Sequence, residues 1–292
     1  MRSVLHTAFV TILVLVLMGC SGRDDRAITI SLNNWIGYYP LYYIDEKAWM
    51  DNEIEFRKVT SLMESLKMFQ AGLSDGFCGT QYEYEHSNII KRSTVPVILL
   101  DRSDGGDVIL SNIEIEEIKT TDKKIDVYLE TQSVNSSLFN SFLQEYELSK
   151  SKFNIINTNQ QSISNMPLSE EPKIFVTYEP YASTLLHTGY KKIASTKNMN
   201  LLVIDGLFLK ESIAQNRRET LQKLKANIIK ALNILENNPQ EFYSTIKPYL
   251  QGQSFEEFKK SLGTIEWIVN NRNKAMQDAL KKHNIPQQWL VK

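Results

Sequence analysis

The sequence is poor in the residues that build metal centres and disulfide frameworks. It contains two Cys and four His in 292 residues, and the spacing of the four His (His6, His86, His187 and His283) is not that of a metal site. Cys78 lies in the apolar string Gly76-Phe77-Cys78-Gly79, which is typical of a small buried hydrophobic residue. We therefore expect no metal ion, no cofactor and no disulfide.

The chain also lacks a charge imbalance. Its formal net charge is -1, and acidic and basic residues are mixed along its length. This excludes the strongly basic surface of a typical nucleic-acid-binding protein. No Ser/His/Asp arrangement and no pair of catalytic carboxylates stands out either, so the sequence gives no support for a hydrolase.

Only one pronounced apolar run is present, and it lies at the N-terminus. Residues 8–18 follow the basic start Met1-Arg2 and precede small residues, a pattern typical of a secretory signal. Leu17-Met18-Gly19-Cys20 resembles a bacterial lipobox, although Met18 replaces the usual small residue. This resemblance implies a signal peptide over residues 1–20 and a lipid on Cys20, so that the exported chain is anchored to a membrane and faces the periplasm or the cell exterior. A plain cleaved signal is the alternative.

From residue 27 onward, short apolar segments alternate with amphipathic ones, which predicts an α/β fold with a largely parallel sheet. Strands are predicted over residues 28–32, 54–57, 76–78 and 95–100. A second series starts after residues 107–110, with strands near 124–129, 153–156 and 173–176 and a helix over 136–146. Residues 201–204 have an extended pattern, and the chain from residue 210 onward is predicted to be almost entirely helical.

The clearest helix of the first series begins beside Ser61. Ser61 and Glu64 have the spacing of a capping box, and Gly72 marks the end of the helix. Backbone N–H groups are free at a helix N-terminus, so Ser61 is a candidate ligand contact.

No Pro/Gly-rich linker separates the two series, so we expect two lobes joined by short connections. Open α/β sheets bind ligands at the carboxyl ends of their strands. The sequence therefore predicts a ligand cleft between the lobes.

Five segments of the chain resemble motifs of one known family, the solute-binding proteins of nitrate/taurine/sulfonate-type ABC transporters, which share their fold with proteins that bind or make the thiamine pyrimidine. The segments occur in the family's order: Trp35-Ile-Gly37-Tyr38-Tyr39-Pro40-Leu41-Tyr42, Ser65 to Asp75, Asp101-Arg-Ser103-Asp-Gly105-Gly106-Asp107, Tyr178-Glu179-Pro180-Tyr181 and Leu235-Glu236-Asn237-Asn238-Pro239. Together they cover almost the whole chain behind the signal.

The resemblance implies a type II periplasmic-binding-protein fold, with two α/β lobes, a hinge and a ligand cleft between them. Lobe 1 would comprise residues 27–110 and 205–292, and lobe 2 residues 111–204. Such a protein captures a small molecule and delivers it to an ABC permease and ATPase without catalysing a reaction. We expect it to act as a monomer.

Two other functions remain open for this fold. A tethered sensory subunit would need the same closing cleft and would report to a membrane signalling receptor. An enzyme of thiamine-pyrimidine synthesis would need a Cys-rich iron site, and the chain offers only Cys78 for one.

Aromatic residues behind the first predicted strand are the first candidate ligand contacts. Trp35, Tyr38 and Tyr39 follow that strand and would face the cleft, where rings suit a flat or cationic ligand. Tyr42 and Tyr43 enter the next helix, and we expect them to pack in the core.

Acidic and hydroxyl side chains near the first crossing between lobes form a second group of candidates. Asp101, Ser103 and Asp107 can approach a ligand from the hinge, although Asp and Ser beside glycines are also ordinary turn residues. The remaining candidates lie at predicted strand ends and helix starts, where the alternative role is helix capping; they are Thr80, Gln81, Thr131, Ser133, Tyr178 and Glu179.

The charges in these motifs bear on the class of ligand. An oxyanion is normally met by Arg or Lys, but the matched motifs carry Asp101, Asp104, Asp107 and Glu179 and only one basic residue, Arg102. The sequence therefore favours a neutral or cationic nitrogenous ligand, such as a pyrimidine or an amine, over nitrate or a sulfonate.

Overall fold

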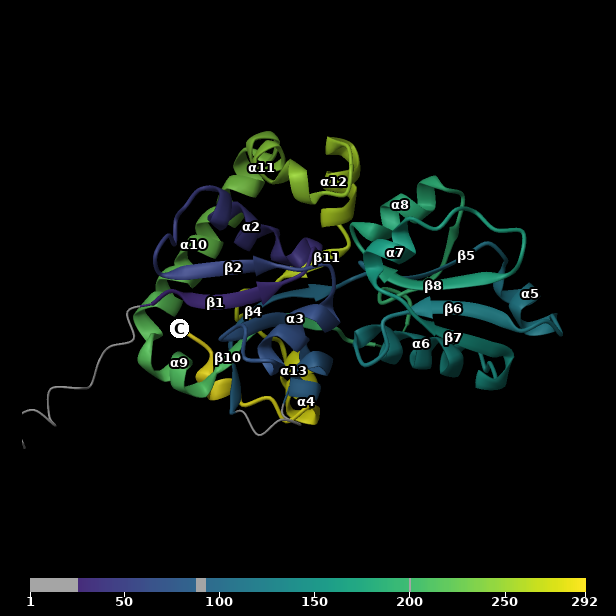
Figure 1. Cartoon of the computed structure of the whole chain (residues 1–292), viewed down its shortest axis with the longest axis horizontal. Coiled ribbons are helices and arrows are strands. Elements are labelled where there is room, and N and C mark those ends of the chain that lie inside the picture. Colours follow the sequence, from purple (N-terminus) through teal and green to yellow (C-terminus); the bar gives the residue numbers. More distant parts are fainter. Residues whose placement is uncertain (1–25, 88–92, 200) are drawn as a thin grey trace, which may run out of the picture.

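Two mixed β-sheets, each covered by helices, lie side by side in the computed structural model (Figure 1). The structure describes residues 26–87, 93–199 and 201–292. The predicted signal peptide and Cys20 lie outside the described residues. Within the described residues, no helix combines the length and the apolar character needed to cross a membrane.

The first sheet has six strands, in the order β11 (Ile265–Trp267), β4 (Thr94–Ser103), β10 (Ile204–Lys210), β3 (Gly76–Thr80), β1 (Ile28–Leu32) and β2 (Ile54–Lys58). The second has five, in the order β7 (Phe153–Asn157), β6 (Ile125–Leu129), β8 (Lys173–Tyr178), β5 (Asp107–Ser111) and β9 (Lys191–Ser195). The predicted strand positions are therefore confirmed to within a few residues, except in the region of β10.

The expectation of largely parallel sheets is wrong. Strands β1, β2 and β3 are parallel, but β10 runs antiparallel to both β3 and β4. In the second sheet, β5 likewise runs antiparallel to β8 and β9. Strands β5 and β10 each enter their sheet from the other lobe and so run against the strands built by local crossovers. The short edge strand β11 of the first sheet also runs antiparallel to its neighbour, β4.

These pairings also place the change of lobe earlier than expected. The sequence assigned residues 107–110 to lobe 1, but β5 pairs only with strands of the second sheet. The chain thus leaves the first sheet after Ser103 and returns to it at Ile204.

Helices cover both sheets. Those packed around the first sheet are η1 (Ile36–Tyr38), α2 (Tyr39–Glu46), α3 (Leu62–Gln70), α4 (Gln81–Ser87), α9 (Glu211–Asn216), α10 (Arg218–Asn237), α11 (Pro239–Ile246), η4 (Lys247–Tyr249), α12 (Phe255–Leu262), α13 (Lys274–Lys282) and η5 (Gln287–Trp289). The second sheet carries α5 (Ile115–Thr120), α6 (Val134–Glu145), η3 (Lys150–Lys152), α7 (Gln160–Ser164) and α8 (Tyr181–His187). The long C-terminal series of helices therefore packs with the first sheet.

Local sequence explains the helix that borders the cleft. Ser61 caps α3, since its side chain accepts a hydrogen bond from the Glu64 N–H at 3.2 Å. Glu64 reaches back to the Thr60 N–H at 2.9 Å, one residue before the position that a capping box would use. Gly72 has φ 78°, a conformation that costs glycine little, and it ends the helical segment.

Candidate functional site

Most of the predicted ligand residues meet where the two lobes touch. The Trp35 ring of lobe 1 contacts the Tyr178 ring of lobe 2 edge-on, with centroids 5.8 Å apart. Asn33 Nδ2 donates to the Tyr178 hydroxyl at 2.9 Å across the same boundary. A Cβ at Gly106 would lie 2.6 Å from the Trp35 ring, so this close approach requires glycine. Two of the predicted ligand residues, Trp35 and Tyr178, thus contact each other across the lobe boundary.

Trp35 and Tyr38 also hydrogen-bond to buried carboxylates of the first sheet. Trp35 Nε1 donates to Asp101 Oδ1 at 3.2 Å, and the Tyr38 hydroxyl donates to Asp205 Oδ1 at 2.6 Å. Asp101 and Asp205 face each other in the β4–β10 register. Burial, followed by the repulsion between neighbouring carboxylates, raises the pKa of Asp205 well above its ordinary value, and burial also raises that of Asp101. Sequence analysis missed Asp205 because it lies beyond the matched motifs.

Asp107 lies near this pair at the start of β5. Burial raises its pKa to about 7, the Ser103 hydroxyl acts against this shift, and the charge of Glu83 adds to it. Its Oδ2 atom has no hydrogen-bond partner among the described residues. Ser103 itself accepts from the Asp107 N–H at 3.1 Å and bonds to Thr196 at 2.8 Å. Ser103 therefore ties the two crossing segments together, a hinge position that the sequence predicted.

Glu83 is a further residue that the sequence analysis missed. It follows the predicted contacts Thr80 and Gln81 on the first turn of α4 and is fully buried. Its Oε2 accepts from the Thr80 N–H at 2.8 Å, and its Oε1 accepts from the Val134 N–H at 2.8 Å, at the start of α6 in the other lobe. A carboxylate at a helix N-terminus is favoured by the helix dipole. Glu83 thus joins the lobes directly.

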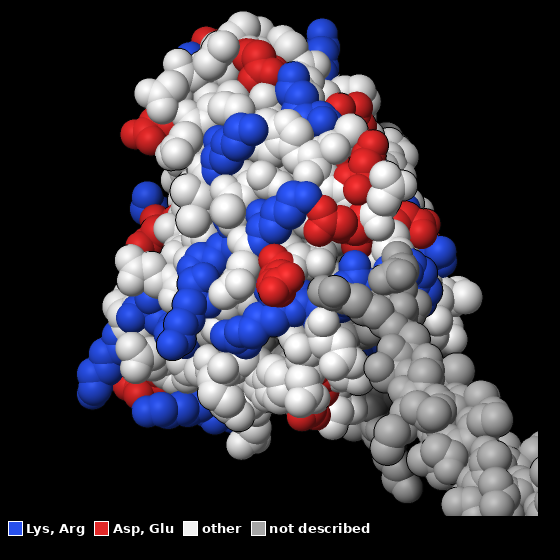
Figure 2. All heavy atoms as spheres, turned by 90° about the vertical axis from the view of Figure 1, so that its left-hand side faces the viewer, with Lys and Arg blue, Asp and Glu red and all other residues white. Residues whose placement is uncertain are grey.

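We refer to Glu83, Asp101, Asp107 and Asp205 as the carboxylate cluster. Among the described residues, no ion pair links any of the four to a Lys, Arg or His. On the outer face of lobe 1, Lys and Arg side chains are mixed with Asp and Glu side chains (Figure 2). The cluster is therefore acidic and enclosed.

The other predicted residues of lobe 2 lie around this boundary. Ser133 caps α6, with its side chain accepting from the Asn135 N–H at 3.2 Å. Glu179 accepts from the Ser183 hydroxyl at 2.7 Å and from Gln253 Nε2 of lobe 1 at 3.3 Å. Ser133 thus plays the capping role that the sequence left open. Glu179 is not the N-cap of α8, but it accepts from the Ser183 N–H of this helix at 3.3 Å and also contacts the opposite lobe.

Gln81 and Tyr39 are buried at the edge of the site. Gln81 bonds to the chain returning from lobe 2, donating to the Leu202 carbonyl at 2.6 Å and accepting from the Ile204 N–H at 2.9 Å. Tyr39 packs on Phe258, and burial, followed by the nearby Glu179 charge, raises its pKa well above the ordinary value. As expected, Tyr42 and Tyr43 are core residues, with Tyr43 stacked on Phe242.

A cavity of about 620 Å³ opens between the lobes at the N-terminus of α3. Lobe 1 lines it with Thr60, Ser61, Met63, Glu64 and Lys67, and lobe 2 lines it with Glu130, Asn157, Thr158, Asn159 and Ser162. We call this cavity the interlobe groove. Ser61 is the predicted ligand residue that lines it, whereas the predicted contact Thr131 lies behind it, with its N–H bonded to Asn157 Oδ1 at 2.9 Å.

The described residues contain no group of three His, Cys, Asp or Glu side chains arranged to hold a metal ion. Cys78 is buried, as its apolar neighbours predicted.

Comparison with solved structures places this arrangement in a known fold. A ligand-binding component of an ABC-type import system from Staphylococcus aureus, solved with zinc bound, superposes with a TM-score of 0.70 at 14% identity, over 91% of this chain and 96% of that one. The chain has the two-lobe, type II fold of periplasmic binding proteins. The sulfonate-binding protein SsuA of Escherichia coli gives a TM-score of 0.69 at 12% identity, over 89% of this chain and 86% of its own.

A third similar structure is the alkanesulfonate-binding protein SsuA of Xanthomonas axonopodis pv. citri bound to MOPS, with a TM-score of 0.69, 12% identity, and coverage of 91% of this chain and 96% of that one. No protein-family model matches the sequence, and no curated protein matches it either. At these sequence identities the similarity shows the fold alone. The class of ligand has to be inferred from the residues of the site.

Proposed function

We propose that this protein is the solute-binding component of an ABC importer. It is exported and held to the membrane through a lipid on Cys20. Its two lobes close on a small nitrogenous ligand that is neutral or cationic. The similar solved structures are ligand-binding components of such importers. The crossings near Ser103 and Ile204 supply a hinge of the kind that lobe closure needs.

The observation that carries the choice of ligand is the carboxylate cluster at the lobe boundary. Burying carboxylates without a cation is unfavourable, and it leaves either a shared proton or an incoming positive group to neutralise them. Asp101 Oδ2 and Asp107 Oδ2 have no hydrogen-bond partner among the described residues. Hydrogen-bond donors of an amine or a protonated ring would satisfy these atoms, whereas a sulfonate would be repelled.

Titration calorimetry of the mature chain tests this proposal. The panel contains simple amines, aminopyrimidines, taurine, an alkanesulfonate and nitrate. We expect binding of a nitrogenous compound without an acidic group. Tight binding of taurine or the alkanesulfonate, with no binding of amines or pyrimidines, would overturn the choice of ligand.

Transport and sensing use the same closing cleft, so a separate observation distinguishes them. Neighbouring genes for a permease and an ATPase support the importer. A single neighbouring gene for a membrane signalling receptor would favour a tethered sensor.

A further inference from the structure

We propose that the interlobe groove is a further subsite, for a cationic group of the ligand, and that Glu130 is the residue that anchors this group. This inference rests on the proposed function and adds a residue that no sequence motif identified. Glu130 follows β6 directly and lies at the boundary where lobe 2 meets the N-terminus of α3.

The geometry of Glu130 distinguishes it from other carboxylates of the surface. Glu130 is only 3% exposed, yet it lines an open cavity of about 620 Å³. Its Oε2 atom has no hydrogen-bond partner among the described residues. A buried polar atom without a partner costs free energy, and a ligand donor that reaches it through the groove would recover that cost.

The walls of the groove indicate what else the ligand carries. Asn157 Oδ1 accepts from the Thr131 N–H at 2.9 Å, and Asn159 Oδ1 accepts from the Ser162 N–H at 2.8 Å. Each side-chain oxygen thus accepts one bond within lobe 2, which turns the amide so that its NH₂ group is available as a donor for a ligand. The groove therefore suits a cationic nitrogen together with acceptor atoms such as a ring nitrogen, a hydroxyl or a carbonyl.

Several titratable groups face Glu130, and most of them are acidic or neutral. They are Glu64 and Lys67 on α3, Glu83 on α4, Tyr178 at the end of β8 and Tyr181 on α8. Burial raises the pKa of Glu130 to about 8, the Ser61 hydroxyl and the Met63 N–H act against this shift, and the charges of Glu83 and Glu64 add to it. A cation bound here stabilises the ionised carboxylate, so binding at neutral pH releases a proton.

The first test measures that proton on the unaltered protein. Methylguanidine and 1,4-diaminobutane are titrated into the purified chain by calorimetry, in two buffers of different ionisation enthalpy. We expect the heats to differ by an amount that corresponds to a substantial fraction of one released proton near pH 7, falling towards zero well above the pKa of Glu130. Binding without proton release overturns the assignment, and so does failure of both probes to bind.

The second test compares two variants, each of which removes one carboxylate charge. Glu130→Gln should weaken binding of both probes about 10-fold to 100-fold, the range expected for losing a charged hydrogen-bond partner, and should abolish the proton release. Glu236→Gln, on the exposed side of α10, serves as the matched control and should leave affinity unchanged. A third variant, Lys67→Gln, removes the basic residue of the groove wall and should strengthen cation binding slightly.

The outcomes separate this inference from the function on which it rests. Amine or pyrimidine binding that survives Glu130→Gln overturns the role of Glu130 and leaves the nitrogenous ligand standing. Tight alkanesulfonate binding that Lys67→Gln weakens, with no amine binding, overturns both.

Discussion

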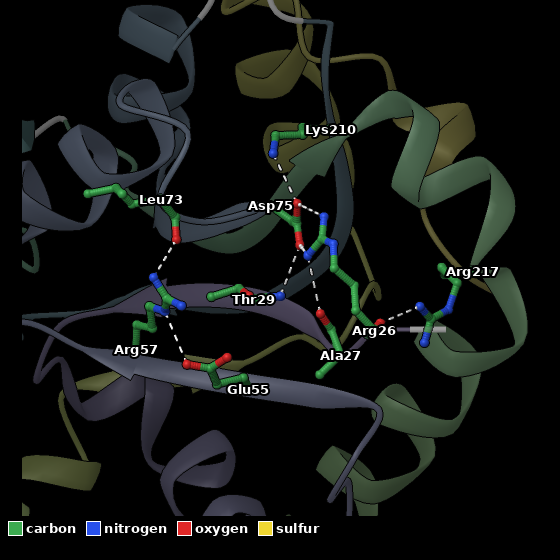
Figure 3. Close-up of polar contacts among 9 residues, drawn as sticks. All are labelled: Arg26, Ala27, Thr29, Glu55, Arg57, Leu73, Asp75, Lys210 and Arg217. Carbon is green, nitrogen blue, oxygen red and sulfur yellow. Dashed lines mark hydrogen bonds and ion pairs between the residues drawn. The ribbon is translucent and has the colours of Figure 1, made fainter. Parts of the chain in front are cut away.

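The two ends of the first sheet treat buried carboxylates in opposite ways. At the outer end, Asp75 precedes β3 and accepts from Arg26 at 2.5 and 2.8 Å, from Lys210 at 2.9 Å and from the Thr29 N–H at 3.1 Å (Figure 3). At the cleft end, Asp101 and Asp205 receive one neutral donor each, from Trp35 and Tyr38. Lys210 and Asp205 belong to the same strand, so a single β10 connects the two environments.

The paired carboxylate at the outer end and the unpaired carboxylates at the cleft end have opposite pKa shifts. Burial acts against the charged form of Asp75, but its hydrogen bonds to Arg26 and Lys210 outweigh burial and hold its pKa well below the ordinary value. Burial without a cation raises the pKa of Asp101 and Asp205. A paired carboxylate stabilises the fold at neutral pH, whereas the unpaired ones cost stability that a bound cation would restore.

The largest expected effect is the pH dependence of stability in the ligand-free protein. Asp107 and Glu130 have folded-state pKa values raised to about 7 and about 8, so the folded state binds more protons than the unfolded state below these values. Stability should therefore fall as pH rises from the ordinary carboxyl pKa towards these values and level off above them, with a loss of about 2 to 4 kcal/mol between about pH 6 and about pH 8. Urea unfolding across this range measures it, and a flat profile would contradict the unpaired state of these groups.

The second prediction concerns the paired end. Asp75→Asn removes the charge that Arg26 and Lys210 share and should lower the free energy of unfolding at neutral pH by about 2 kcal/mol. Because the folded pKa of Asp75 is lowered, this contribution exists above the ordinary pKa of Asp and disappears as the medium becomes more acidic. The two proteins should thus converge in stability towards low pH.

Glu55→Gln is the control for this prediction. Glu55 pairs with Arg57 at 3.1 Å beside the same sheet, but both side chains are well exposed (Figure 3). Exposed pairs contribute little, so its effect should stay below about 0.5 kcal/mol. A loss equal to that of Asp75→Asn would mean that burial does not distinguish the two pairs.

The sequence predicted most strands of the first sheet and misplaced one, β10. Hydrophobic periodicity and capping residues located most strands and α3, because those signals are local. The strand β10 was placed at residues 201–204 because Asp205-Gly206 does not resemble strand sequence. It forms there because β3 and β4 supply partners on both sides, a tertiary effect.

Site residues divided in the same way. Trp35, Asp101 and Tyr178 were predicted as ligand contacts because they lie in motifs that resemble a known family. Glu83, Glu130 and Asp205 lie outside those motifs, and their importance comes from burial and from contacts with the other lobe. No spacing along the chain encodes such contacts.

The third prediction tests whether Glu83 holds the lobes together in solution. Glu83→Gln replaces one carboxylate oxygen by an NH₂ group, which cannot serve both the Thr80 and the Val134 N–H groups as acceptor. Hydrogen exchange of the Val134 amide should accelerate about tenfold, corresponding to about 1.4 kcal/mol. The Ile228 amide in α10 is the internal reference and should not change, and unaltered exchange at Val134 would show that the lobes part without this bond.

The smallest expected effect has the opposite sign to that of Asp75→Asn. Asp205→Asn keeps an acceptor for the Tyr38 hydroxyl at 2.6 Å but removes one of two carboxylates that face each other across β4 and β10. The ligand-free protein should gain about 1 kcal/mol of stability at mildly alkaline pH, since Asp101 then ionises without an acidic neighbour opposite it. Urea unfolding of both proteins measures the gain. If Asp205→Asn instead lowers the free energy of unfolding as Asp75→Asn does, the Asp205 carboxylate stabilises the ligand-free fold. The carboxylate cluster would then not support the proposal of a cationic ligand.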